Sequence, residues 1–457
     1  MRIVFIITDK VYIRSFVNTG IISELCKYHE VTLLLKEGID FADIKKKNLF
    51  FEIYQIDRYS KSKTNYFDIL ITNLKHKSKY FPFRLKRLYR HDFRYLNELC
   101  LKNKVKINFL NKSKYFNILL INLVKYCYYV FLSKNVIFNL LKKLNFFVYP
   151  VNKDLTLKIN KFSPDKIIIP SSGYMPEIYD LNFLSTKNNI RYQVIVDNWD
   201  NLSSKMIFQN SPDKVYVWGE QTALHANEIH SIPQKKIIKI GCARYLNFFL
   251  QRNNNSLTNY FNTNYALFFG SSWSWNEENT LEELDIIITK NISLFDNFKI
   301  IYRPHPFRQR HTDFKKKYKN IIYDPQIIQF YASKNKSWPD LEYYPSLLKN
   351  SLFCVGGLTS MLIESTIFYK KYLAIGYDDN ESLMNQKNAL KYFVHLEQIE
   401  NLPNVSIVHR KQNLESEFIE TYMNFSNIIK KEIDEKRDFF LHNPSDNISD
   451  IILKNLD

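Results

Sequence analysis

Cysteine is scarce in this sequence and never occurs in a metal-binding pattern. None of the cysteines belongs to a Cys-x-x-Cys pair or a close Cys/His cluster, which argues against a zinc-finger type of site and a disulfide framework. We interpret them as reduced thiols of a cytoplasmic protein. The five are Cys26, Cys100, Cys127, Cys242 and Cys354.

Long hydrophobic runs are also absent. A membrane-spanning helix needs about 18 or more apolar residues in succession, and Lys125 and Lys134 interrupt the best run. The N-terminal stretch MRIVFIITDK reaches Asp9 and Lys10 too early for the apolar core of a signal peptide. The sequence therefore predicts neither a membrane span nor export.

Acidic residues are nearly missing from one part of the chain. Between Lys61 and Lys153 there are 20 Lys/Arg and three acidic residues, a difference of 17, whereas the whole chain has a net charge of +18. Aromatic and leucine residues are interleaved with these charges. Three interpretations compete, namely a surface for anionic membranes, a solvated helical excursion and a nucleic-acid surface. We favour a peripheral location on the inner face of the cytoplasmic membrane, because no RNA- or DNA-binding signature is present.

The remaining composition suits a folded protein with two cores. The chain has 457 residues, of which 45% are hydrophobic and 24% charged, and this length fits two α/β domains of roughly 150 to 250 residues each. Apolar strand-like stretches alternate with helical ones in both halves, which predicts parallel sheets in two Rossmann-like domains that face a cleft. The strand-like stretches include RIVFIIT, EVTLLLKEG, DKIIIP, YQVIV, KVYVWG and KIIKIG, then YALFFG, FKIIYR, NIIYDP, SLFCV and YLAIG.

The linker QRNNNSLTNYFNTN, rich in asparagine and poor in packing residues, marks the change of domain. We place an N-terminal domain at 1–255, with a basic helical insertion at about 61–153, and a C-terminal domain at 262–410. Helical apolar spacing from Leu414 to Lys436 and the final SDNISDIILKNL predict C-terminal helices over 411–457.

The most informative motif is SLFCVGGLTSMLIESTIFYKKYLAIG, residues 351–376. A buried strand ends before Gly356 and Gly357, and Thr359 and Ser360 then begin a helix whose free amides favour an anion. Glu364 follows Ser360 by one helical turn, where its carboxylate could accept hydrogen bonds from a ribose. The alternative is an ordinary strand-to-helix turn with a helix cap.

The second motif is IIYRPHPFRQR. An apolar strand ends at Arg303, and two prolines stiffen the loop that carries His305. A guanidinium can bind phosphate through two nitrogens, and an imidazole can donate a hydrogen bond to it. The cluster therefore predicts contact with phosphate.

The order of these motifs resembles the C-terminal donor domain of GT-B glycosyltransferases. It is similar in particular to the group around bacterial capsule sugar transferases and the CDP-glycerol glycerophosphotransferases. In addition, VDNWDNLSSK and the stretches after it resemble surface carbohydrate biosynthesis proteins, although TDKVYIRS stands where such proteins usually have a glycine-rich loop. The resemblance implies donor binding by Ser271, Ser272, Arg303, His305, Gly356, Gly357, Thr359, Ser360 and Glu364.

Two carboxylates in the N-terminal half are candidates for catalysis. Asp197 and Asp200 follow the strand YQVIV, and either could act as general base toward an acceptor hydroxyl; Asp and Asn side chains also commonly cap turns. Trp199, Lys205 and His225 are candidates for acceptor binding. We expect no essential metal and no cofactor besides the nucleotide-sugar co-substrate, because GT-B enzymes generally neutralise the leaving diphosphate with helix amides and basic side chains.

The sequence thus predicts a metal-independent glycosyltransferase. It would move a sugar from a nucleotide-activated donor to a lipid-linked or growing surface polysaccharide, such as capsule or lipopolysaccharide. The alternatives are a polyol-phosphate transferase of the CDP-glycerol type, a non-hydrolysing UDP-sugar epimerase, and a basic scaffold that binds membranes or nucleic acid without catalysis.

Overall fold

The computed structural model divides the chain into two compact units. The first comprises Met1–Leu246 and Asp438–Asp457, and the second Asn247–Arg437. The structure describes residues 1–56, 78–81, 83, 120, 121, 123, 124, 127, 131, 136, 137, 140, 151–171, 175–206, 208, 210–254, 257–271, 275–305, 318–332, 342–378, 385–443 and 447–456. Most of the predicted basic insertion at 61–153 therefore lies outside the described residues.

The first unit contains a seven-stranded parallel sheet in the order β3-β2-β1-β4-β5-β6-β7. Strands such as β4 and β5 are buried on both faces, as the continuous apolar runs predict for a parallel sheet with helices on each side. The strands are β1 (Arg2–Ile7), β2 (Glu30–Lys36), β3 (Phe51–Tyr54), β4 (Lys166–Ser171), β5 (Tyr192–Val196), β6 (Lys214–Val217) and β7 (Ile237–Lys239).

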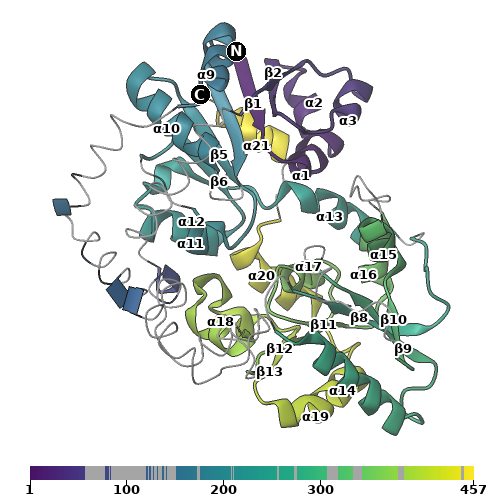
Figure 1. The fold of residues 1–457 in the computed structure, drawn as a ribbon. Coiled ribbons are helices and arrows are strands. Elements are labelled where there is room, and N and C mark those ends of the chain that lie inside the picture. The colour runs from purple at the N-terminus through teal and green to yellow at the C-terminus, as the bar shows by residue number, and fades with distance from the viewer. Residues whose placement is uncertain are drawn as a thin grey trace, which may run out of the picture. The chain divides into compact units, whose positions relative to one another are not determined.

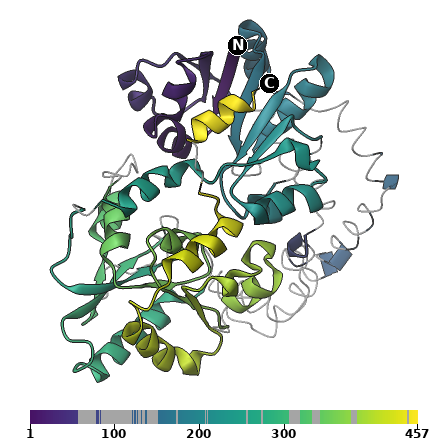
Figure 2. The ribbon, with the colours of Figure 1, turned by 180° about the vertical axis from the view of Figure 1, so that it is seen from behind.

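Helices on both sides of this sheet complete the first unit. The last helix, α21, lies next to α2 and β1 in both ribbon views (Figures 1 and 2), and its Ile448 and Ile452 belong to the core that the sheet forms. The helices are α1 (Lys10–Tyr12), α2 (Ile21–Leu25), α3 (Ala42–Lys46), α9 (Lys153–Phe162), α10 (Pro176–Asn188), α11 (Asn201–Ser204), α12 (Glu220–Glu228) and α21 (Ile448–Lys454).

The second unit has a six-stranded parallel sheet in the order β10-β9-β8-β11-β12-β13. The strands are β8 (Asn264–Phe269), β9 (Phe298–Arg303), β10 (Ile321–Tyr323), β11 (Cys354–Gly356), β12 (Tyr372–Ile375) and β13 (Val405–Val408). The helices are α13 (Leu246–Arg252), α14 (Glu277–Lys290), α15 (Pro325–Ala332), α16 (Tyr343–Asn350), α17 (Met361–Ile367), α18 (Gln386–Tyr392), α19 (Leu414–Met423) and α20 (Lys430–Phe440), the last of which runs on into the first unit.

Opposite faces of the second sheet are covered by different helices. Leu281 and Leu284 of α14 and Phe418 of α19 pack on one face, and Figure 1 shows these two helices side by side. On the other face, Tyr344 of α16 packs its ring against Phe269 of β8, with centroids 6.1 Å apart. This three-layer arrangement confirms the predicted Rossmann-like architecture.

The structure differs from the sequence-based expectation in three places. Strands β3 and β13 were not predicted, because each is a short edge strand without a long apolar run. The single helical pattern from Leu414 to Lys436 is two helices, since α19 ends at Met423 and α20 starts at Lys430. The first unit ends at Leu246, before the linker predicted after residue 255. Helix α13 belongs to the second unit because its Phe248 packs on Tyr344 and Phe368.

Candidate functional site

The candidate donor site lies at the carboxyl edge of the second sheet. In chain order, β8, β9 and β10 extend the sheet in one direction and β11, β12 and β13 in the other. The switch point therefore falls between β8 and β11, which is where open α/β sheets characteristically bind ligands. The predicted residues Ser271 and Gly356–Ser360 follow these two strands.

Close backbone contact brings the two loops together. A Cβ atom on Gly356 would lie 2.5 Å from the carbonyl oxygen of Phe269, and one on Gly357 would lie 3.4 Å from Cβ of Ser271. The hydroxyl of Tyr372 donates a 2.7 Å hydrogen bond to the carbonyl of Gly357. A glycine is required at 356, because a side chain there would separate the loops.

The Thr-Ser turn leads into α17. The amides of Leu362 and Ile363 bond back to the carbonyls of Thr359 and Ser360 at 3.1 and 3.0 Å, and that of Met361 bonds to Oγ1 of Thr359 at 3.3 Å. Within the described part of the chain, the amides of Thr359 and Ser360 themselves have no recorded acceptor. Two consecutive N–H groups after a glycine turn form the kind of concavity that binds anions.

A buried carboxylate fixes the loop after β8. Glu277, 3% exposed, accepts hydrogen bonds from the backbone N–H of Ser271 at 2.7 Å and from the Tyr302 hydroxyl at 2.6 Å. The indole N–H of Trp275 donates to Oγ of Ser271 at 2.7 Å. Ser271 is thus fully buried and held from both sides, while Ser272 lies outside the described residues.

Arg303 has protein partners that the sequence analysis did not anticipate. Its guanidinium, 7% exposed, forms an ion pair with Asp324 and donates a 2.9 Å hydrogen bond to Gln326. It also lies over the ring of Tyr344, 4.7 Å from the centroid. A phosphate would compete with Asp324 for this charge, so the placement favours a role for Arg303 in positioning the loop that follows β9.

His305 lies two residues beyond Arg303 and is half-buried. Its carbonyl accepts a 2.7 Å hydrogen bond from the hydroxyl of Tyr331 on α15, which fixes the backbone of this loop. The N–H of Gly270 donates to the carbonyl of Arg303 at 2.9 Å, so the loops after β8 and β9 are joined as well. The structure therefore brings Ser271, Arg303, His305 and the Gly-Gly turn to one edge.

Glu364 is buried on α17, with 4% of its surface exposed. Its carboxylate accepts a hydrogen bond from the hydroxyl of Tyr344 at 2.5 Å. Glu364, which the sequence predicts to bind a ribose, is thus linked through Tyr344 to the guanidinium of Arg303. Binding of a ribose by Glu364 stays a prediction, since this oxygen already has a protein partner.

The first unit also gathers polar groups at the carboxyl edge of its sheet. Asp197 follows β5, and its backbone N–H donates a 3.0 Å hydrogen bond to the carbonyl of Ser171 at the end of β4. Burial raises the pKa of its carboxyl group, and the nearby Arg244 and Lys205 oppose that rise. Asp197 therefore holds a proton more readily than an exposed aspartate, as a general base requires.

The other candidates in this half have different environments. Asp200 forms a 2.7 Å ion pair with Lys205, so these two predicted residues are together. Trp199 is 2% exposed and packs edge-on against Phe440, with centroids 6.2 Å apart. His225 is 6% exposed within α12. The Trp199 ring is a packing group at this burial, and contact of Trp199 or His225 with an acceptor stays a prediction.

Sequence analysis missed the residues that support these sites. Asp324, Tyr344 and Glu277 each bond to a predicted residue, although none belongs to either motif. For Asp324 a signal existed, because it directly follows the apolar residues Ile321–Tyr323, in the same position as the polar residues after the other strands. Among the described residues, no group of three or more His, Cys, Asp or Glu side chains has the geometry to hold a metal ion.

The comparisons with known proteins found similarity in fold only. No protein-family model and no curated protein matches it. A solved structure of a candidate UDP-N-acetylglucosamine 2-epimerase from Listeria monocytogenes superposes with a TM-score of 0.50 and 8% identity, over 99% of this chain and 94% of that one.

Two further solved structures align over almost their whole length. The UDP-N-acetylglucosamine 2-epimerase of Neisseria meningitidis bound to UDP-N-acetylglucosamine has a TM-score of 0.49 and 10% identity, over 100% of this chain and 99% of that one. A glycosyltransferase of Rickettsia africae has a TM-score of 0.44 and 10% identity, over 100% and 96%. At such identities a likeness concerns the fold alone, and the fold of this chain is two Rossmann-like α/β domains of the GT-B type.

Proposed function

We propose that this protein is a glycosyltransferase of the GT-B type that moves a sugar from a nucleotide-activated donor to a lipid-linked or growing surface polysaccharide. The observation that supports it best is the meeting of two predicted donor loops at the switch point of the second sheet. There, two backbone amides lack an acceptor within the described residues, and they could bind the diphosphate without a metal ion.

The donor would be held by the second unit. The amides of Thr359 and Ser360 would bind a phosphate, and His305 on the adjoining loop would donate a hydrogen bond to the other. Arg303 and Glu364, joined through Tyr344, would keep both loops in place. A nucleoside diphosphate is the ligand class that such a pair of loops suits.

The acceptor would be bound by the first unit, where Asp197 and Asp200 follow β5. Of these two carboxylates, Asp197 is the one that would contact the acceptor, because the carboxylate of Asp200 pairs with Lys205. The transfer would proceed when an acceptor oxygen attacks the anomeric carbon and the nucleoside diphosphate leaves.

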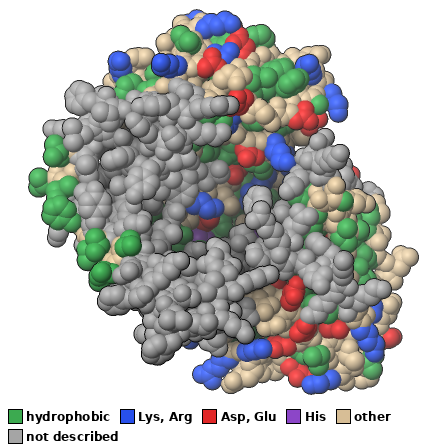
Figure 3. All heavy atoms as spheres, viewed as in Figure 1, with side chains coloured by type: hydrophobic (Ala, Val, Ile, Leu, Met, Phe, Trp, Pro, Cys, Tyr) green, Lys and Arg blue, Asp and Glu red, His purple; other side chains and the backbone are tan. Residues whose placement is uncertain are grey.

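The proposal includes a peripheral location on the inner face of the cytoplasmic membrane. Among the described residues, no helix is long and apolar enough to cross a bilayer. Exposed apolar side chains, coloured green, lie at the left of Figure 3 next to the grey atoms. Such side chains within a basic sequence suit an anionic interface. Those exposed within the basic segment are Leu120, Ile121, Leu123, Val124, Phe131, Val136 and Leu140.

A thermal-shift screen with UDP-, CDP-, GDP- and CMP-linked donors, followed by calorimetry, tests the proposal. We expect one donor class to raise the melting temperature and His305→Ala to weaken its binding by about 1.5 to 3 kcal/mol, the range for a hydrogen bond to a charged group. His409→Gln is the control, because His409 is exposed and pairs with Glu400. Absence of binding by every donor would contradict the proposal.

The same panel separates the alternatives. Preference for a CDP-linked polyol would identify the protein as a polyol-phosphate transferase. Inversion of the sugar at C2 without loss of the nucleotide would identify it as an epimerase. Salt-sensitive RNA binding with no nucleotide binding would assign a scaffold.

A further inference from the structure

The C-terminal segment brings a histidine to the carboxyl edge of the first sheet. After α20, the backbone N–H of His442 donates a 2.7 Å hydrogen bond to the carbonyl of Trp218, the residue that follows β6. Gly219 permits this approach, because a Cβ atom there would lie 2.8 Å from the carbonyl oxygen of Asp438 and 2.9 Å from that of Phe439. His442 is therefore held at the strand end by backbone contacts.

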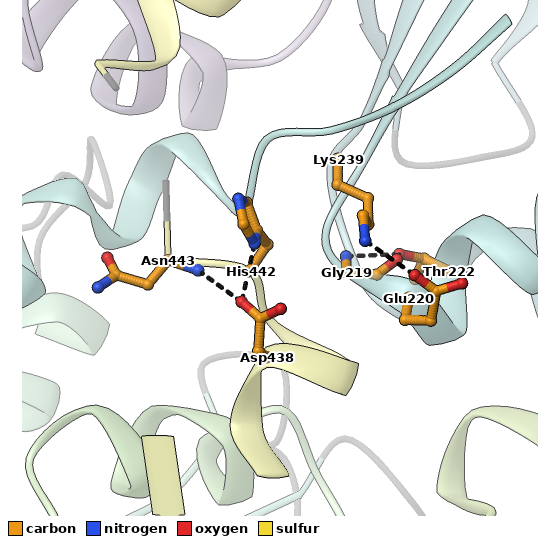
Figure 4. Close-up of polar contacts among 7 residues, drawn as sticks. All are labelled: Gly219, Glu220, Thr222, Lys239, Asp438, His442 and Asn443. Atoms are coloured by element: carbon orange, nitrogen blue, oxygen red, sulfur yellow. Dashed lines mark hydrogen bonds and ion pairs between the residues drawn. The ribbon is translucent and has the colours of Figure 1, made fainter. Parts of the chain in front are cut away.

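His442 forms a close pair with Asp438, one helical turn earlier. Its Nδ1 lies 2.8 Å from Oδ1 of Asp438, and the backbone N–H of Asn443 donates to the same oxygen at 3.4 Å (Figure 4). With the carboxylate as acceptor, Nδ1 carries the proton and Nε2 is left as the basic nitrogen. The side chains of His442 and Asp438 are 30% and 49% exposed, so the pair is partly accessible to solvent.

This pair adjoins the loop that the sequence analysis assigned to the reaction. The ring of Phe440 packs against Trp199 in that loop, and the indole N–H of Trp218 donates a 3.1 Å hydrogen bond to the carbonyl of Val196, just before Asp197. His442 thus belongs to the same strand-end surface as Asp197.

Several charged groups around this surface have partners of their own. Lys239 forms a 2.9 Å ion pair with Glu220 at the start of α12 (Figure 4), and the guanidinium of Arg244 lies 5.1 Å from the ring centroid of Trp218. Asp200 is paired with Lys205. His442 combines a partly exposed imidazole with a carboxylate that orients it.

We propose that His442 is the general base of the transfer and that Asp438 is its positioning residue, an inference that rests on the proposed glycosyltransferase function. Nε2 accepts the proton of the acceptor hydroxyl as that oxygen forms a bond to the anomeric carbon of the donor. The bond from the anomeric carbon to the diphosphate oxygen breaks, and the nucleoside diphosphate leaves with the electron pair. The imidazolium ion is stabilised by Asp438 and then releases its proton to water.

The experiment measures nucleotide release from the UDP-, GDP-, CDP- or CMP-linked donor selected by the thermal-shift screen, with the full-length protein and water as the acceptor. His442→Gln should lower kcat about 100-fold or more, the usual effect of a general base, with donor Kd and melting temperature unchanged. Asp438→Asn should lower kcat by a smaller factor at unchanged KM. Added imidazole should restore part of the activity of His442→Ala, which loss of a merely structural contact would not allow.

Each other outcome overturns a specific statement. Wild-type turnover in His442→Gln, or a loss in His442→Ala that imidazole does not restore, overturns the role of His442 while donor binding still supports the transferase. If His442→Gln loses no more turnover than the control His409→Gln, the role of His442 is overturned as well. If the wild-type protein binds no donor or releases no nucleotide, the proposed function fails and this inference fails with it.

Discussion

The hydroxyl of Tyr344 donates a hydrogen bond to the buried carboxylate of Glu364, while its ring lies under the guanidinium of Arg303. This single side chain therefore joins the two motifs that sequence analysis singled out. Neither motif contains it.

Tyr344→Phe should remove the hydrogen bond and keep the ring. Because Glu364 is 4% exposed, loss of a donor to it should lower the free energy of unfolding by about 1 to 3 kcal/mol. Urea denaturation measures the change, with Tyr28→Phe as the control, since Tyr28 is 63% exposed. Equal stability of the two variants would contradict a structural role for this bond.

Gly270→Ala should disturb the loops after β8 and β9 together. The added Cβ would lie 2.7 Å from Oε2 of Glu277 and 2.8 Å from the backbone nitrogen of His305. Overpacking of this kind costs about 1 to 3 kcal/mol, and calorimetry should show weaker binding of the donor. Gly357→Ala makes a milder comparison, because its Cβ would meet the flexible end of Gln386. A Gly270→Ala protein with wild-type stability and donor affinity would show that the loops are not closely packed.

Lys370 should make stability depend on pH. Burial lowers the pKa of its amine to about 8, and Nζ donates a 2.6 Å hydrogen bond to the carbonyl of Ser351. An unfolded lysine titrates near 10.5, so between about pH 8 and 10.5 the unfolded chain binds more protons than the folded one. The free energy of unfolding should therefore rise with pH through that window, because the cost of burying the charged amine disappears.

Tyrosines also titrate near pH 10. Comparing the wild type with Lys370→Met isolates the contribution of Lys370, because both proteins contain the same tyrosines. The stability of the wild type relative to Lys370→Met should rise from pH 8 to 10 with a slope of at most about 1.4 kcal/mol per pH unit. The control Lys319→Met removes an exposed lysine instead of a buried one. A flat or falling difference for Lys370→Met would refute the lowered pKa.

Arg437 should contribute strongly to the stability of the second unit. It is 2% exposed, pairs with Asp434 at 2.6 Å and donates to the carbonyl of Thr366 at 3.3 Å. Arg437→Met should cost about 1 to 3 kcal/mol, less than for a fully buried pair because Asp434 is 39% exposed. The exposed pair of Lys431 and Glu435 on the same helix is the matched control, and Lys431→Met should cost no more than about 0.5 kcal/mol.

The basic segment should bind anionic membranes. We expect the protein to co-sediment with anionic vesicles and poorly with neutral ones, and salt should reduce the binding without abolishing it. Replacing Arg84, Lys86, Arg87 and Arg90 with glutamine should reduce vesicle binding and leave donor affinity intact. Equal binding to neutral and anionic vesicles would rule out the membrane location.

The sequence by itself determined the architecture and the approximate position of the donor loops. Continuous apolar runs such as KIIIP and YALFF can be buried on both faces only as strands of a parallel sheet with helices on each side. Polar residues and glycines at the ends of these runs must then lie at one edge, which is how Ser271, His305 and the Gly-Gly turn could be predicted as neighbours.

Only the tertiary structure decided which side chains meet across that edge. Periodicity along a strand contains no information on strand order, so the ion pair of Arg303 with Asp324 on the neighbouring strand could not be read from the motif. Residues 438–457 return to the first unit, where Ile448 and Ile452 join its core, His442 bonds to the carbonyl of Trp218 and Gly219 leaves room for the chain. The pairing of His442 with Asp438 is local in sequence, but its place next to Trp218 at the end of β6 exists only because distant segments pack together.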